Sequence, residues 1–144
     1  MVHQMVELKE CINFLLSKTE LAVHQRFKQI LEPHGITPVQ CGVLNCLYKE
    51  DGLSLKAIAD SLALNASTIT GIIDRMEEKK FIKRKPDRSD RRSISIFLTD
   101  KAKKLEPETV NAITELNSSV MKELTEQEKV TFRRLLRIVT ETAS

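Results

Sequence analysis

The chain has little of what several large protein classes require. Its 144 residues include no tryptophan, one tyrosine, four glycines and four prolines. So few aromatic residues and glycines argue against a β-sandwich and favour helices. No apolar run approaches the roughly 18–20 residues that a membrane span needs. Glu7 and Glu10 stand early, so the chain does not begin like a signal peptide. We expect a mainly helical cytoplasmic protein that does not enter a membrane.

Residues that support catalysis or metal binding are equally sparse. Cys11, Cys41 and Cys46 are an odd number without close pairing, which indicates a reducing compartment rather than a disulfide framework. The histidines are scattered, so we expect no metal site. There is no Gly-rich phosphate loop, no Ser/His/Asp set in a recognisable context and no paired carboxylates in a predicted cleft. The sequence therefore predicts neither an enzyme nor a cofactor.

Charge is present in quantity and is unevenly distributed. The chain is 41% apolar and 30% charged, which fits one globular unit with its own core. The net charge of +3 is too small to be diagnostic. However, cations crowd the segment 75–92, and acidic residues dominate after Glu106. This asymmetry predicts a nucleic-acid face and a separate helical face.

Apolar spacing predicts helices before and after the basic segment. A helix is expected over about 5–32, stopped by the proline and glycine in 33–35. Thr37, Pro38 and Gln40 form the start of a second helix, with Gln40 completing a capping box.

The middle of the chain predicts a winged helix-turn-helix. Ser54 caps a short helix, and a turn at 63–65 leads to a second helix over about 66–79. The segment 85–100 has the pattern of a basic β-hairpin with alternating residues in its second strand. In such a motif the second helix enters the major groove of DNA. We place this DNA-binding domain at 35–100.

The last third of the chain predicts two more helices. Thr99 caps a helix over about 100–124, which Pro107 either kinks or divides. Thr125 and Glu128 form a capping box for the final helix, which carries an apolar stripe.

The polar face of the helix over 66–79 supplies the first candidates for DNA contact. Hydroxyl groups bond phosphates or base edges, and an arginine reaches phosphate or a guanine edge. Gly71 would allow the DNA backbone to approach closely. An ordinary surface helix has the same two-faced pattern, but the basic hairpin behind it favours DNA. The candidates on this face are Ser67, Thr68, Thr70, Asp74 and Arg75.

The wing carries the most specific pattern. Segments 55–62, 67–79 and 81–84 are generic to winged helices. Asp87–Ser93, with an Asp-x-Arg pattern at the tip, a following strand and then Leu98-Thr99, is much more specific. In these features the sequence resembles the MarR family of bacterial transcriptional regulators, and the flanking helices extend the resemblance over essentially the whole chain.

The resemblance implies a homodimer on a pseudo-palindromic operator in double-stranded DNA. In it, the regions 1–34 and 101–144 form a helical dimerisation region, and the apolar stripes near both termini independently need a partner. By motif position, Arg92 enters the minor groove and Asp90 orients its guanidinium through a bidentate pair. Arg88 and Arg91 meet phosphates or acidic residues.

One position departs from the family pattern. Many relatives have glycine just after the recognition helix, where this chain has Lys80. If the chain turns there through a left-handed conformation, a residue with a Cβ costs roughly 1 kcal/mol. Either Lys80 accepts that strain or the helix ends differently.

The resemblance also implies control of DNA binding, with repression as the family's usual mode. A small aromatic or phenolic effector is expected between the dimer helices and the DNA heads. The candidate pocket residues are Leu16, Phe27, Val43 and Leu47.

Two alternative functions remain. In an oxidant-responsive regulator of the same fold, Cys11 would be the redox residue, but the position that matches the sensing cysteine of such relatives is Asn13, on the opposite side of a helix. We therefore expect Cys11 to be inert. The second alternative is a winged-helix adaptor that binds proteins and not DNA.

Overall fold

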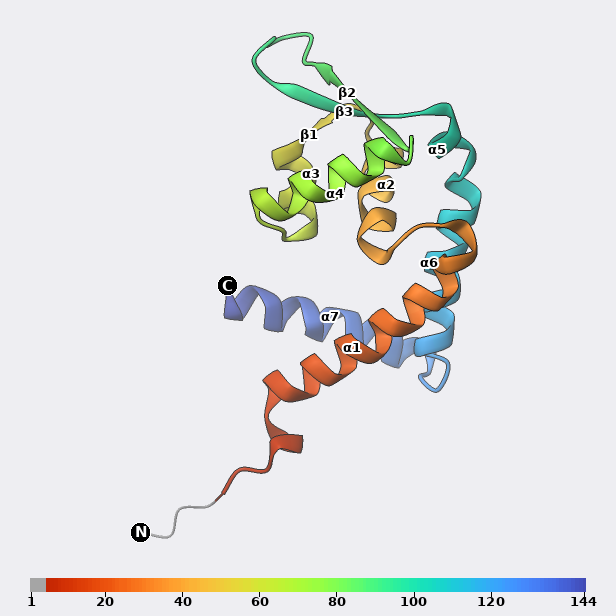
Figure 1. Ribbon diagram of the computed structural model, residues 1–144. Helices are drawn as coiled ribbons and strands as arrows, with labels where there is room; N and C mark the ends of the chain where they lie inside the picture. Colours follow the sequence, from red (N-terminus) through yellow and green to blue (C-terminus); the bar gives the residue numbers. More distant parts are fainter. Residues whose placement is uncertain (1–4) are drawn as a thin grey trace.

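The computed structural model describes residues 5–144 as two connected regions (Figure 1). The upper region, called the head below, holds α2, α3, α4 and a three-stranded sheet, and the lower region, called the helical layer, holds α1, α6 and α7 (Figure 1). A short helix, α5, links the two. The helices are α1 (Ile12–Leu31), α2 (Pro38–Lys49), α3 (Leu55–Leu62), α4 (Ala66–Glu78), α5 (Asp100–Lys104), α6 (Glu106–Val120) and α7 (Glu126–Ala143), with short 3-10 turns η1 (Leu8–Glu10) and η2 (Glu32–His34). Mainly helical architecture with a small β wing is confirmed, and no helix within 5–144 is long and apolar enough to cross a membrane.

The N-terminal helix begins later than the sequence pattern predicts. Residues 1–4 lie outside the described part. After η1 the backbone is extended at Cys11, and α1 begins at Ile12. The expected start near residue 5 is therefore wrong. Leu8 is 67% exposed, so its apolar side chain packs against too little to hold an extra helical turn.

The predicted caps and breaks are otherwise confirmed, with one refinement. Thr37 and Thr125 form capping boxes, and Ser54 and Thr99 accept hydrogen bonds from the backbone N–H groups three residues later. Pro107 divides the expected long helix, because it stands in the first turn of α6. That helix ends at Val120, short of the expected 124.

The sheet is antiparallel in the order β1-β3-β2. β2 (Ile82–Pro86) and β3 (Ile94–Leu98) form the predicted hairpin, although it begins at Ile82 and not at the expected 85, and β1 (Leu53–Ser54) adds a third strand along β3. β1 has only two residues, which is too short to show the alternation of apolar and polar residues that indicates a strand, so the sequence did not predict it. The core of the head lies between this sheet and α2, α3 and α4; its fully buried members include Leu44, Leu47, Ile58, Ile73, Met76 and Ile96.

The turn after α4 shows how the chain accommodates Lys80. Its φ is 63°, the left-handed conformation that glycine favours. The N–H of Phe81 donates to the carbonyl of Met76 at 3.0 Å, and that of Lys80 donates to Glu77 at 2.9 Å. These two bonds form a Schellman motif. Phe81 and Met76 are both buried, so core packing holds Lys80 in its strained conformation.

We expect Lys80→Gly to stabilise the fold by about 1 kcal/mol, because glycine adopts this conformation without a Cβ clash. Chemical denaturation at fixed protein concentration measures the change. Glu78→Gly, two residues earlier at the last residue of α4, is the matched control and should destabilise by a similar amount. Equal destabilisation by both glycines would show that position 80 is not strained.

Candidate nucleic-acid interface

The recognition helix α4 is fixed by its buried side and capped at its start. Ile69, Ile72, Ile73 and Met76 are buried against the head. Asn65 Oδ1 accepts hydrogen bonds from the backbone N–H of Thr68 and from Ser67 Oγ, both at 2.8 Å. The sequence pattern missed Asn65 as this cap, although asparagine is a common residue there.

The predicted hydroxyl candidates lie on the exposed side of α4. Ser67, Thr68 and Thr70 are all exposed. Thr70 Oγ1 donates to the carbonyl of Ala66 at 2.9 Å, so its lone pairs rather than its proton are free for a partner. The structure thus brings the three hydroxyl groups to one exposed surface at the N-terminal half of the helix.

The absence of a side chain at Gly71 leaves room for the side chain of Arg75. A Cβ on Gly71 would stand 3.6 Å from Nη1 of Arg75, the nearest heavy atom. The guanidinium of Arg75 therefore folds back over the glycine one turn earlier. The space that we expected the DNA backbone to use is occupied by this side chain.

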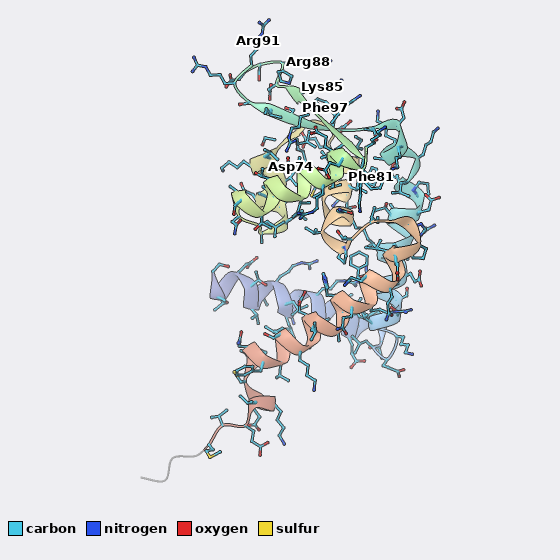
Figure 2. The ribbon with its side chains drawn as sticks, viewed as in Figure 1. Asp74, Phe81, Lys85, Arg88, Arg91 and Phe97 are labelled. Atoms are coloured by element: carbon cyan, nitrogen blue, oxygen red, sulfur yellow. The ribbon has the colours of Figure 1, made fainter. Side chains whose placement is uncertain are left out.

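The wing projects from the head as a paired hairpin with an arginine-rich tip. Its register pairs Ile82 with Leu98 and Pro86 with Ile94. Arg88, Arg91 and Arg92 are exposed in the tip between the strands. Figure 2 shows Arg88 and Arg91 at the far end of the hairpin, directed away from the head.

The tip is ordered by Asp87, which the sequence pattern did not single out. Its carboxylate accepts from the Ser89 N–H at 2.8 Å, from Ser89 Oγ at 2.7 Å and from Ser95 Oγ at 3.3 Å. Its own N–H donates to the Ser93 carbonyl at 2.8 Å. The hydrogen bonds from Ser89, followed by that from Ser95, lower the pKa of Asp87. The signal was the Asp-x-Ser spacing, which is typical of an Asx turn.

Asp90 has a different contact from the one that the family resemblance implies. Its Oδ1 accepts from the backbone N–H of Arg92 at 2.9 Å, and its Oδ2 accepts from Ser93 Oγ at 3.4 Å. Within residues 5–144 no ion pair joins Asp90 to the Arg92 guanidinium, so the expected bidentate pair is not formed here. A carboxylate two residues before a backbone N–H reaches that N–H easily, and Asp90 makes this local bond.

A further arginine connects the wing to the recognition helix. Arg84 Nη1 lies 2.9 Å from Glu77 Oε1, and its Nη2 contacts Asp74 Oδ1. The hydrogen bond with Asp74 raises the pKa of Arg84. Arg84 was not predicted as a site residue. It lies two residues after the buried Ile82 on β2, so both side chains are on the inner face of the sheet.

The four predicted effector residues do not form one site. Val43 and Leu47 are 0% and 1% exposed, so they belong to the core of the head and offer no surface to a ligand. Leu16 and Phe27 lie eleven residues apart on α1, about 16 Å along the helix axis. The apolar periodicity marked core positions and could not distinguish them from a pocket.

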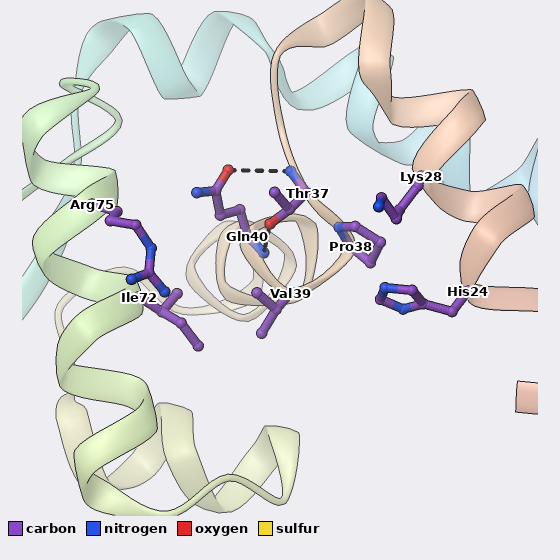
Figure 3. A pocket seen from close by; sticks show the side chains of 8 residues that line it. All are labelled: His24, Lys28, Thr37, Pro38, Val39, Gln40, Ile72 and Arg75. Carbon is purple, nitrogen blue, oxygen red and sulfur yellow. Dashed lines mark hydrogen bonds between the residues drawn. The ribbon is translucent and has the colours of Figure 1, made fainter. Parts of the chain in front are cut away.

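A hollow of about 320 Å³ lies between α1, α2 and α4 (Figure 3). His24 and Lys28 line it from α1, and Arg75 lines it from α4. Its remaining lining comes from Thr37, Pro38, Val39, Gln40 and Ile72, so no carboxylate is among the lining residues. The sequence missed this site because its three basic residues are far apart in the chain.

The cysteines have different surroundings. Cys41 is 1% exposed on α2, and burial raises the pKa of its thiol to about 11. Cys46 is half-buried, and Cys11 stands partly exposed just before α1. Cys41 is thus a core residue. None of the described histidine, cysteine and carboxylate side chains forms a cluster that could hold a metal ion.

Known proteins match both the head and the whole chain. The MarR family model matches residues 36–94. The HTH-type transcriptional regulator MgrA of Staphylococcus aureus is 31% identical over 130 residues, which are 90% of this chain and 87% of that protein. The chain belongs to the MarR family. TtmR of Methylorubrum extorquens, another HTH-type transcriptional regulator, is 37% identical over 99 residues, 65% of this chain and 51% of that protein.

Solved structures agree with this assignment. The Bordetella bronchiseptica regulator BpsR has a TM-score of 0.89 at 25% identity, over 95% of this chain and 98% of that one. The DNA complex of S. aureus MepR has a TM-score of 0.82 at 26% identity, over 93% of this chain and 97% of that one. The protein is therefore a DNA-binding transcriptional regulator with a winged helix-turn-helix, and not an enzyme.

We expect Asp87→Ala to loosen the wing tip, because the N–H of Ser89 and the hydroxyls of Ser89 and Ser95 lose their acceptor. Hydrogen exchange at Ser89 should become faster, while the thermal midpoint of the whole protein stays close to that of the wild type. DNA affinity should fall roughly three- to tenfold, since the tip must then be ordered on binding. Asp60→Ala, on the exposed side of α3, is the control. A tip that keeps its exchange rates without Asp87 would contradict this role.

Proposed function

We propose that this protein is a homodimeric repressor that binds a pseudo-palindromic operator in the cytoplasm and is released by a small aromatic anion. The observation that carries the proposal is the pairing of a DNA-binding head with a helical layer whose apolar side chains remain uncovered in the single chain.

The case for a homodimer rests on α1 and α7. α7 has 18 residues and none is buried, although it carries a clear apolar stripe. A hollow of about 670 Å³ between α1, α6 and α7 is lined mainly by apolar side chains, among them Leu16, Phe132 and Leu136. A stripe of this kind stabilises a helix only when something covers it. The exposed apolar side chains of the two helices are Ile12, Phe14, Leu15, Leu16, Leu21, Val130, Phe132, Leu135, Leu136, Ile138 and Val139.

A symmetric dimer determines the form of the operator. Two identical heads related by a twofold axis read the same half-site in opposite directions. Each head would place α4 in the major groove and the arginines of its wing beside it, in the minor groove and on phosphates. Ser67, Thr68, Thr70 and Arg75 are the proposed contacts of α4, and Arg88, Arg91 and Arg92 are those of the wing.

The hollow between α1, α2 and α4 is the proposed effector site. Lys28 and Arg75 give it two cationic side chains, His24 adds an imidazole, and Pro38, Val39 and Ile72 supply apolar surface for a ring. These features fit an aromatic carboxylate or a phenolate. The published description of BpsR states that 6-hydroxynicotinic acid regulates its DNA binding. Arg75 belongs both to this hollow and to the recognition helix, so an anion that binds Arg75 would withdraw it from DNA.

Specific binding should depend on Arg92. We expect Arg92→Ala to weaken binding to a selected operator roughly 10- to 100-fold, because its guanidinium is lost from the minor groove. The slope of affinity against salt should also fall by about one. Lys122→Ala, which removes one charge from the turn between α6 and α7, is the control for net charge. Light scattering should show that the dimer persists in both variants, and an unchanged operator affinity in Arg92→Ala would overturn the role of Arg92.

The operator itself comes from selecting bound sequences from a random DNA pool. We expect two inverted half-sites whose centres lie about one helical turn apart. A single half-site, or recovery of no sequence above background, would contradict a dimeric sequence-specific repressor and would favour the protein-binding adaptor.

Cys11 provides the test of the oxidant alternative. We expect Cys11→Ser to leave operator affinity unchanged before and after peroxide treatment, because Asn13 and not Cys11 occupies the position of the sensing cysteine in oxidant-responsive relatives. Band-shift titrations of both proteins, with and without peroxide, measure this. If peroxide releases the wild type from DNA and not the serine variant, the oxidant-responsive function replaces the effector-responsive one.

A further inference from the structure

The recognition helix carries two carboxylates toward the surface that binds DNA. Asp74 follows Ser67 by seven residues and Thr70 by four, so it lies two turns and one turn along the same side of α4. Glu77 stands three residues further on and is less exposed. A carboxylate on this side approaches the DNA phosphates, and unpaired like charges across an interface weaken binding.

Arg84 lies where it can offset both carboxylates. It pairs with Ile96 in the hairpin, on the face of the sheet that packs against the helices of the head. Ile96 is fully buried, so the backbone of Arg84 is held at the edge of the core. From there one guanidinium nitrogen bonds Glu77 Oε1 at 2.9 Å and another contacts Asp74.

The guanidinium is directed at the helix and not at solvent. The Arg84 side chain is 25% exposed, compared with 54% for Asp74 and 42% for Glu77. Within residues 5–144, no other cation forms an ion pair with either carboxylate. Arg75, the nearest arginine on α4 itself, is folded over Gly71. Removing Arg84 would therefore leave two uncompensated negative charges on the recognition helix.

We propose that Arg84 is a positioning residue for DNA binding that acts through Asp74 and Glu77 without touching DNA. It cancels part of the negative charge on the recognition helix and fixes the base of the wing against that helix. The spacing between the two DNA-contacting elements then depends on this three-residue bridge.

A double-mutant comparison separates this role from a direct phosphate contact. The affinity for the selected operator is measured over a series of salt concentrations for the wild type, Arg84→Met, Asp74→Asn/Glu77→Gln and the triple variant. We expect Arg84→Met to weaken binding roughly 10- to 100-fold in the wild-type background, with an unchanged slope against salt. In the background without carboxylates, the same change should alter affinity less than roughly threefold.

Two results would overturn the proposal. In the first, Arg84→Met lowers the logarithm of operator affinity in the carboxylate-free background by more than half of what it does in the wild-type background, and the salt slope falls by about one. That result would show that Arg84 neutralises a phosphate. The other is no loss of affinity in Arg84→Met.

A conservative variant guards against a trivial loss of folding. Thermal unfolding of each variant shows whether the fold persists. If Arg84→Met unfolds, Arg84→Lys replaces it in both backgrounds, because lysine keeps the charge but cannot bridge two carboxylates with separate nitrogens of one planar group. The same two criteria then apply.

Discussion

The architecture depends on covering the apolar faces of α1 and α7. The head has its own core between the sheet and α2, α3 and α4, and its turns are satisfied by local hydrogen bonds. α7 has no such support, since none of its residues is buried in the single chain. Because hydrophobic burial is the main force that holds an amphipathic helix in place, these faces require a partner. In the proposed homodimer, a second copy of the chain would supply the same faces with twofold symmetry, and that symmetry would set the distance between the two heads.

Within each head, acidic side chains determine the geometry of the cationic surface. Asp87 and Asp90 shape the wing tip through bonds to backbone N–H groups and serine hydroxyls, and Asp74 and Glu77 hold the base of the wing through Arg84. The arginines at the tip are thereby presented on an ordered scaffold, which would lower the entropic cost of the proposed contacts with DNA. The hollow beside α4 places Arg75 at the junction between this surface and the helical layer.

Local signals in the sequence were enough to predict most of the fold. The capping residues Thr37, Ser54 and Thr125 each act through a bond to a neighbour three positions away, so a short window contains the whole interaction. The arginine tip and the Asp-x-Arg pattern likewise identified the wing. Interactions between distant segments were not predictable. Arg84 meets Asp74 across ten residues, and the hollow joins His24 to Arg75 across fifty-one. Val43 and Leu47, expected at a pocket, are buried in the core, and the sequence could not separate the two because core and pocket positions share one apolar pattern.

The most direct test of this account is the molar mass of the protein in solution, measured by light scattering during size-exclusion chromatography at low micromolar concentration. If a second copy covers α1 and α7, the mass will be twice the 16.4 kDa of the chain. A mass of one chain, with the helices still folded by circular dichroism, would contradict the account, because the apolar faces would then be stable without a partner.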